Sequence, residues 1–252
     1  MRKAIRLRWA AFALLLPLPI SAADVPSWNA KSAAAYLDGR AAWWSAWPRA
    51  ARDHDTFCVS CHTALPYALG RAALSSALGE QETAAPERQL LQNIRKRVAL
   101  WSEVQPFYND ARHGPGKSAE ARATEAVIEA LILTDHDRRS GQFTNESRQA
   151  LDHMMALQLT EGENAGPWTW LDFLNQPWEA PDSAFWGAAL AARALGNAAN
   201  SYRAQVSVAS GLEHLRTYFA RTAAICQQNR RIDCLRSASI SEPAKCRLDF
   251  QD

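Results

Sequence analysis

Apolar residues recur with helical spacing along nearly the whole chain, and similar segments return at intervals of about 60 residues. Segments 63–70, 124–131 and 183–190 are rich in small apolar residues. A second series lies between them, at 91–94, 151–154 and 212–215, and is amphipathic. No alternating β-branched run is long enough for a strand. The pattern predicts an all-α fold of repeated helical hairpins, with the small-residue helices inside; chance similarity among alanine-rich helices is the alternative.

Composition supports a folded chain that carries no strong charge. The 252 residues are 48% hydrophobic and 21% charged, with a formal net charge of +2, which excludes an intrinsically disordered chain. Four basic residues lie within the first eight positions, and without them the net charge is about −2. We therefore expect neither nucleic acid nor an anionic membrane surface as a partner.

The first 23 residues have the organisation of an export signal. A basic cluster precedes the apolar run 9–20, and Ser21, Ala22 and Ala23 follow it. The apolar run is shorter than a bilayer-spanning helix and contains two prolines, which disfavours an uncleaved anchor. We expect cleavage after Ala23, a periplasmic location and no stable membrane span in the mature protein.

The strongest motif is Cys58-Val59-Ser60-Cys61-His62. A C-x-x-C-H run is the attachment signature of c-type haem, in which two thiols bond the porphyrin and the histidine becomes the proximal iron ligand. Three alternatives stay open: a redox-active dithiol, a zinc site and a plain disulfide. No βαβ pattern accompanies the motif, and the other cysteines lie far along the chain. The sequence predicts one covalent haem c held by Cys58, Cys61 and His62.

The second axial ligand is less defined by the sequence. His54 is the leading candidate because it lies close to the motif, in a polar run expected to lead into the haem-bearing segment, and an open sixth position is an equal alternative. The remaining candidates are the other methionines and histidines of the mature chain: Met154, Met155, His113, His136, His153 and His214.

One stretch resembles a known repeat. Residues 151–158, followed by Gly162 and Trp168, resemble the glutamine–tryptophan repeat of squalene–hopene cyclases and related terpenoid cyclases, and 182–188 look like their inner helix. Residues 57–67 are also similar to bacterial proteins that combine a C-x-x-C-H motif with this fold. The resemblance covers about 28–220 and implies an α/α toroid, incomplete here because too few hairpins are present.

The departures from that family matter for function. The cyclases protonate their substrate with an acidic D-x-D-D motif, and no such run occurs in this chain. The nearest approach, Asp135-His136-Asp137, is interpreted as a set of solvated turn residues after a helix. Terpene cyclisation is therefore disfavoured.

A tryptophan cluster and a group of glutamates are expected to have mainly structural roles. Trp43, Trp44 and Trp47 form an aromatic cluster that is interpreted mainly as packing, with a ligand-facing wall as the alternative. Glu125 and Glu129 share a helix face near Glu120, and a salt link to Arg122 or Lys117 is expected for these carboxylates, with a proton-coupled site as the alternative.

The chain is predicted to divide into three parts: the signal 1–23, a helical-repeat domain 24–220 with the haem motif, and an irregular tail 221–252. Three cysteines in the tail predict one disulfide, between Cys226 and Cys234, and leave Cys246 over. A truncated or frame-shifted end is the alternative explanation of the tail.

Three functions remain open from the sequence. The leading hypothesis is an exported c-type cytochrome that transfers electrons to an unidentified redox partner protein. The second is a haem enzyme or sensor with an apolar or sugar-like ligand in the toroid. The third is a non-haem helical binding module with a Cys58–Cys61 disulfide.

Overall fold

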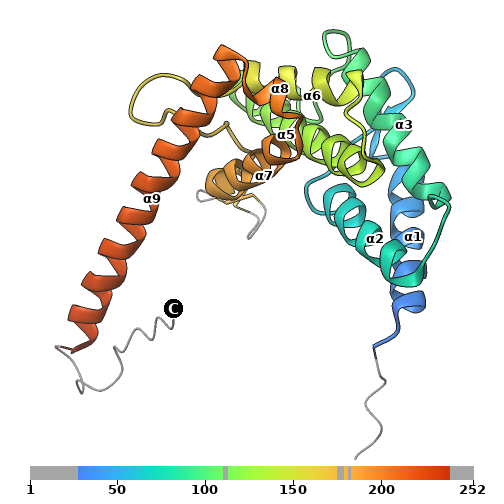
Figure 1. The fold of residues 1–252 in the computed structure, drawn as a ribbon, viewed down its shortest axis with the longest axis horizontal. Coiled ribbons are helices and arrows are strands. Elements are labelled where there is room, and N and C mark those ends of the chain that lie inside the picture. Colours follow the sequence, from blue (N-terminus) through green and yellow to red (C-terminus); the bar gives the residue numbers. More distant parts are fainter. Residues whose placement is uncertain (1–27, 110–112, 175–178, 181–182, 239–252) are drawn as a thin grey trace, which may run out of the picture.

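The computed structural model describes residues 28–109, 113–174, 179–180 and 183–238 (Figure 1). This part of the chain is mostly helical, which confirms the all-α prediction. Its helices are α1 (Ala30–Ala46), α2 (Ala64–Leu78), α3 (Ala85–Ala99), α5 (Pro115–Ser140), α6 (Asn145–Ala156), α7 (Ser183–Asn197), α8 (Asn200–Arg203) and α9 (Val206–Ala238). Its strands are β1 (Ala51–Arg52) and β2 (Thr56–Phe57).

Helix α5 is the centre of the fold. It packs against α6 and α7, and also contacts α2 and α3, while α1 packs on α2. Val127, Ala130 and Leu131 on α5 are completely buried, which explains why its apolar residues lie on all sides rather than along one stripe. In Figure 1 the helices form an arch, with α1 to α3 at one end and α7 and α9 at the other.

Each apolar segment of the two predicted series lies in a helix. The small-residue segments lie in α2, α5 and α7, and the amphipathic segments lie in α3, α6 and α9. Local signals explain several helix ends. Pro115 occupies the first turn of α5, Gly141 closes that helix with φ 68°, and Thr144 accepts a hydrogen bond from the Ser147 amide at the start of α6.

The polar run before the C-x-x-C-H motif forms a hairpin instead of leading directly into a helix. Strands β1 and β2 pair antiparallel, and the turn between them places His54 at φ 55° and Asp55 at φ 52°. Two successive residues with positive φ are the geometry of a type I′ turn, which matches the twist of a tight hairpin. Two residues per strand are too few to leave an alternating pattern in the sequence.

The segment that follows α6 connects this helix to α9 through side-chain hydrogen bonds. Gln158 Nε2 donates to the Gly166 carbonyl at 2.7 Å and to the Gly211 carbonyl at 2.9 Å, and Trp168 Nε1 donates to the Met154 carbonyl at 2.6 Å. Trp168 is 1% exposed. The glutamine and the tryptophan thus cross-link backbone carbonyls of three segments, those of Met154, Gly166 and Gly211.

The run Asp135-His136-Asp137 corrects the sequence interpretation, because it lies inside α5 and both aspartates are buried. Asp135 pairs with Arg193 of α7 at 2.9 Å. Asp137 Oδ2 accepts hydrogen bonds from the amide and the hydroxyl of Thr144, both at 2.7 Å. Burial of a carboxylate requires partners, and these come from other elements that sequence spacing does not show.

Helix α9 continues past residue 220, where an irregular tail was expected to begin. Residues 221–238 contain no Gly or Pro, so no residue there breaks a helix. Cys226 and Cys234 are eight residues apart in this helix, which separates their Cα atoms by about 12 Å at 1.5 Å per residue. A disulfide usually spans less than about 7 Å between Cα atoms; the side chains of both cysteines lie outside the described part of the structure, and the pairing stays a prediction.

The signal at 1–23 and Cys246 lie outside the described residues. Within the described parts of the chain, none of the helices combines the length and the apolar character that a membrane crossing needs.

Candidate functional site

The loop that carries the C-x-x-C-H motif connects β2 to α2 and is held at both ends. The Cys58 amide donates to the Ala50 carbonyl, and Trp44 Nε1 donates to the Cys58 carbonyl, each at 2.8 Å. Ser60 Oγ accepts from the amides of Thr63 at 3.0 Å and Ala64 at 3.1 Å, so it caps the first turn of α2. His62 therefore has a fixed position immediately before the helix.

Asn93 of α3 anchors the residue before the motif. Its side chain accepts from the Phe57 amide at 2.8 Å and donates to the Phe57 carbonyl at 2.9 Å. This pair of bonds replaces a missing neighbouring strand for β2. The hairpin, α1 and α3 together fix the start of the motif, although they are far apart in the sequence.

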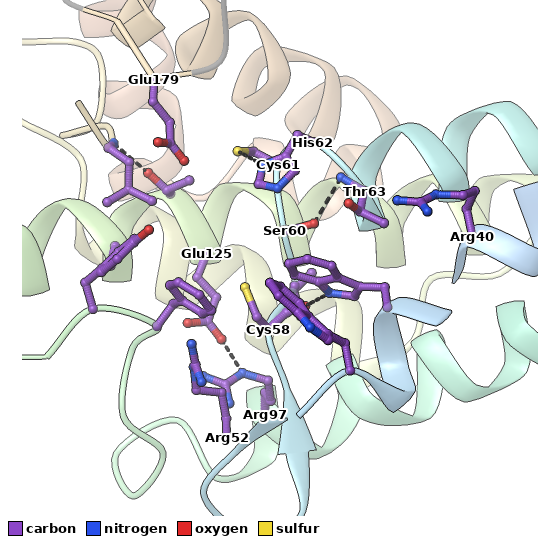
Figure 2. Close-up of a pocket in the computed structure, with 18 of the residues that line it drawn as sticks. Arg40, Arg52, Cys58, Ser60, Cys61, His62, Thr63, Arg97, Glu125 and Glu179 are labelled. Carbon is purple, nitrogen blue, oxygen red and sulfur yellow. Dashed lines mark hydrogen bonds and ion pairs between the residues drawn. The ribbon is translucent and has the colours of Figure 1, made fainter. Parts of the chain in front are cut away.

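The motif opens onto a cavity of about 400 Å³, a size typical of small-molecule and cofactor sites. In Figure 2 both sulfur atoms point to the same side of the loop, toward the space between Glu179 and Glu125. Its walls come from α1, the hairpin, the motif, α3, α5 and two loops: Arg40, Trp43, Trp44, Trp47, Arg52, Cys58, Val59, Ser60, Cys61, His62, Thr63, Arg97, Phe107, Tyr108, Ala121, Thr124, Glu125, Leu171 and Glu179.

The tryptophan cluster packs together and also borders the cavity. Trp43 and Trp47 stack with ring centroids 5.3 Å apart, and Trp44 is buried. All three also line the cavity, so the packing cluster is at the same time an aromatic wall.

Both motif cysteines are free thiols, so the structure does not contain the Cys58–Cys61 disulfide of the third hypothesis. Burial, with a further effect from Glu125, raises the pKa of Cys58 well above its usual value, and burial together with Glu179 raises the pKa of Cys61 to about 12. Thiols that stay protonated at neutral pH are poor nucleophiles, which disfavours a thioredoxin-like dithiol.

His62 lies between an aromatic ring and a sulfur. It contacts Trp44 edge-on at a centroid distance of 5.8 Å, and its Nδ1 atom is 3.6 Å from Cys61 Sγ. The carboxylate of Glu179 joins this group: donor atoms of Cys61, His62 and Glu179 all lie within 4.8 Å of one another. Three donors are one fewer than structural zinc sites use.

Glu179 was missed by sequence reasoning. It stands in the loop that precedes α7, more than a hundred residues beyond the motif, and no spacing rule connects the two segments. Its low exposure of 7% is unusual for a glutamate, but exposure is not visible in a single sequence.

The residues present fit a covalently bound haem. Two free thiols at the required spacing and an imidazole border one cavity, whose walls include both aromatic and charged side chains. Arg40 and Arg52 line the same cavity and offer positive charge for the carboxylates of a porphyrin.

His54 does not line the cavity. The hairpin turn directs its ring toward Asp53, at 3.6 Å, and Glu103, at 3.8 Å. Its closeness to the motif in sequence therefore does not become closeness to the cavity, and its position gives no support to a role as distal ligand.

The other candidate ligands also lie elsewhere. Met154 is completely buried in the core, His153 stacks on Trp101 at 4.6 Å, and His113 contacts Tyr108 and Phe173. Met155 and His214 border a separate cavity between α6 and α9, and His136 lies beside Asp137. Among the described residues, His62 is thus the only histidine or methionine that lines the motif cavity.

Buried charges border the cavity on the side of α5. Glu125 forms an ion pair with Nε of Arg97, which comes from α3 rather than from the expected partners. Lys117 does pair with Glu120, as expected, whereas Arg122 donates to the carbonyls of Trp101 and Val104. Burial opposes the charge of Arg97, but Glu125 and Glu129 outweigh that effect and raise its pKa. The sequence did not indicate Arg97 because its partner lies on another helix.

Comparison with known proteins gives no assignment. No family model matches the chain, and neither the curated proteins nor the solved structures contain a significant match.

Proposed function

We propose that the chain is an exported c-type cytochrome that binds one haem through thioethers at Cys58 and Cys61, with His62 as the proximal ligand, and transfers electrons. The observation that carries the proposal is the presence of two free thiols and one imidazole on a single cavity. The haem would supply one-electron redox chemistry.

The chain's own residues have defined tasks in this proposal. Trp44, Ser60 and Asn93 hold the motif loop and its approach through hydrogen bonds to the backbone. Trp43 and Trp47 give the cavity an apolar side, and an apolar surround favours the less charged state of a bound redox group. The redox partner is a protein not identified by these residues.

We further propose that α2 with α3, α5 with α6 and α7 with α9 are three hairpins of an incomplete α/α toroid. This arrangement is supported by the positions of the two apolar series in alternating helices and by the packing of α5 between α2 and α7. The motif then lies at the start of the first inner helix. Export to the periplasm follows from the segment 1–23.

A second function deserves a test because of one observation. Among the described residues lining the cavity, no second histidine or methionine faces His62. An open sixth position would let the iron bind a small ligand, as in a haem sensor or enzyme.

The decisive experiment produces the full chain together with haem-maturation machinery and measures absorbance and intact mass. The proposal predicts one porphyrin that stays attached after denaturation and is lost in the double variant Cys58→Ala/Cys61→Ala. A colourless protein with the mass of the bare polypeptide would exclude it. A reduced spectrum that shifts with carbon monoxide selects the open-site function, and an unshifted low-spin spectrum selects electron transfer.

Histidine variants test the ligand assignment. His62→Ala should remove the native ligand field, because the proximal nitrogen is lost. His54→Ala is the matched control and should leave the spectrum unchanged, since His54 lies outside the cavity. The opposite result would assign the iron ligand to the hairpin.

A further inference from the structure

Two glutamates of α5 and one arginine of α3 form a buried cluster behind the motif cavity. Glu125 and Glu129 are one helical turn apart and are 7% and 1% exposed, and Arg97 is 1% exposed. Nε of Arg97 binds Glu125 Oε1 and lies 3.9 Å from Glu129 Oε1. The cluster therefore holds two carboxyl groups and a single guanidinium in direct contact.

Each nitrogen of the Arg97 guanidinium already donates one hydrogen bond to a group other than Glu129. Its Nε donates to Glu125, its Nη1 to Thr56 Oγ1 at 2.6 Å, and its Nη2 to the Gln105 carbonyl at 2.8 Å. Glu129 Oε1 is buried and accepts no hydrogen bond in the structure. Burying a second ionised carboxylate that has no hydrogen-bonding cation costs free energy. Protonation of that carboxylate removes this cost.

The cluster is connected to the cavity through Glu125. This residue lines the cavity on the same side as Cys58, and the Glu125 carboxylate and the Cys58 sulfur both face it (Figure 2). Glu129 lies one turn farther along α5 and does not line the cavity. A charge change in the cavity therefore acts first on Glu125 and, through it, on Glu129.

We propose that Glu125 and Glu129 share one proton whose binding is coupled to the oxidation state of the haem iron. The inference rests on the proposed function and adds a proton site to it. The pair takes up a proton from solvent when a one-electron donor reduces the iron from the ferric to the ferrous state, and releases it on oxidation. The electron and the proton thus compensate each other's charge in a buried region.

The surrounding charges are compatible with this role. Burial, and next the charge of Glu125, raise the pKa of Glu129 well above its usual value; Arg97 and Arg122 act in the opposite direction. Arg52 of the hairpin and Cys58 of the motif loop face Glu125. From the remaining packed helices, His153 of α6 faces Arg122, and Arg193 of α7 pairs with Asp135.

The test is a spectroelectrochemical titration of the haem-loaded mature protein over a range of pH, with Glu129→Gln and Glu120→Gln as a matched pair on α5. In the wild type the reduction equilibrium should change by up to tenfold per pH unit where the pair titrates, or about 59 mV for one electron. Glu129→Gln should lose this dependence because glutamine holds no titrating proton. Glu120→Gln should keep it, because Glu120 pairs with Lys117 away from the cavity.

Infrared spectra give a second readout that needs no haem. The wild type should show the carbonyl band of a protonated carboxyl group at neutral pH, and Glu129→Gln should lose it. A wild-type potential that does not change with pH, or an unchanged slope in Glu129→Gln, would overturn the coupling. If no haem attaches, the proposed function fails. In that case, loss of the infrared band in Glu129→Gln still supports the proton site. A wild-type protein without the band overturns the proton site.

Discussion

Gly187 marks the closest approach between α7 and the loop that follows α6. A Cβ atom at this position would lie 2.3 Å from Cε3 of Trp170, whose ring is 5% exposed and contacts Trp186 at a centroid distance of 5.5 Å. Because Trp170 is almost fully buried, an added methyl group at Gly187 must displace the ring or the helix. The glycine is thus required by packing rather than by its backbone conformation.

We predict that Gly187→Ala lowers the free energy of unfolding by about 1–3 kcal/mol, because the methyl group overpacks the Trp170 contact. Chemical denaturation monitored by circular dichroism measures this change. Gly196→Ala is the matched control on the same helix: nothing lies within 4 Å of its added Cβ. That variant should gain about 0.5–1 kcal/mol, since alanine loses less backbone entropy in a helix. Equal effects at both positions would contradict the packing argument.

Sequence spacing grouped residues correctly where neighbours in the chain are also neighbours in space. The spacing of Cys58, Cys61 and His62 directs attention to residues that do share one cavity. Glu179 and Arg97, which complete the charges around that cavity, gave no signal because they reach it from a distant loop and from α3.

At the scale of elements, the side chain of Gln158 joins the end of α6 to the start of α9. Its amide nitrogen donates to two buried carbonyls, those of Gly166 and Gly211. We predict that Gln158→Ala lowers the free energy of unfolding by about 1–3 kcal/mol, because both carbonyls lose a donor. Gln142→Ala is the control, since Gln142 is exposed. Chemical denaturation monitored by circular dichroism measures both variants. Similar losses of unfolding free energy in the two variants would contradict the role of Gln158.

The junction between α5 and α6 depends on the charge of Asp137. Burial opposes ionisation, but the neighbouring Ser147 and the two hydrogen bonds from Thr144 outweigh it and lower the pKa of Asp137. A pKa lower in the folded than in the unfolded state stabilises the protein above the unfolded pKa of about 3.9, and this stability is lost as the pH falls through the folded value.

We therefore predict that Asp137→Asn destabilises the protein at neutral pH by about 1–3 kcal/mol. The difference from the wild type should shrink as the pH falls below about 4, because the wild-type carboxyl group then becomes neutral as well. Urea denaturation at several pH values measures this difference. If the difference in unfolding free energy stayed constant down to about pH 2, the charge of Asp137 would play no part in stabilising the junction between α5 and α6.

The sequence predicts the long helices well, but it does not predict the short strands or the full length of α5. Helical periodicity found the long helices, and Gly141 marks the end of α5 as a helix-terminating glycine should. The β1–β2 hairpin escaped notice because its strands have two residues each. The prediction of a turn at Asp135-His136-Asp137 was wrong because polar residues suggest exposure to solvent. Here the two aspartates are buried and have partners on α7 and at the start of α6.

For the molecule as a whole, the buried carboxyl group of Glu129 couples folding to pH. Its pKa is higher in the folded than in the unfolded state, because burial penalises the ionised form. The stability is complete below the unfolded pKa of about 4.3 and falls as the pH rises toward the folded value, by about 1.4 kcal/mol per pH unit for one proton.

We predict that the stability of Glu129→Gln relative to the wild type increases as the pH rises from about 5 to 8, since glutamine stays neutral over this range. Global unfolding by urea at each pH measures the difference. Glu120→Gln should show no such trend, because its partner Lys117 lies in a half-buried surface pair. A flat difference for Glu129→Gln would mean that this carboxyl group is ionised in the folded protein.

Patterns along the sequence are enough to predict the helical class of the chain and the positions of its main helices, and they single out Cys58, Cys61 and His62 as a group. These properties depend on local spacing: the period of an α-helix, and the reach of two thiols and an adjacent imidazole. The folded chain was needed to show which charges border the cavity, that His54 turns away from it, and that α9 extends through residue 238. Burial and pairing between distant segments set these features, and neither can be read from neighbouring residues.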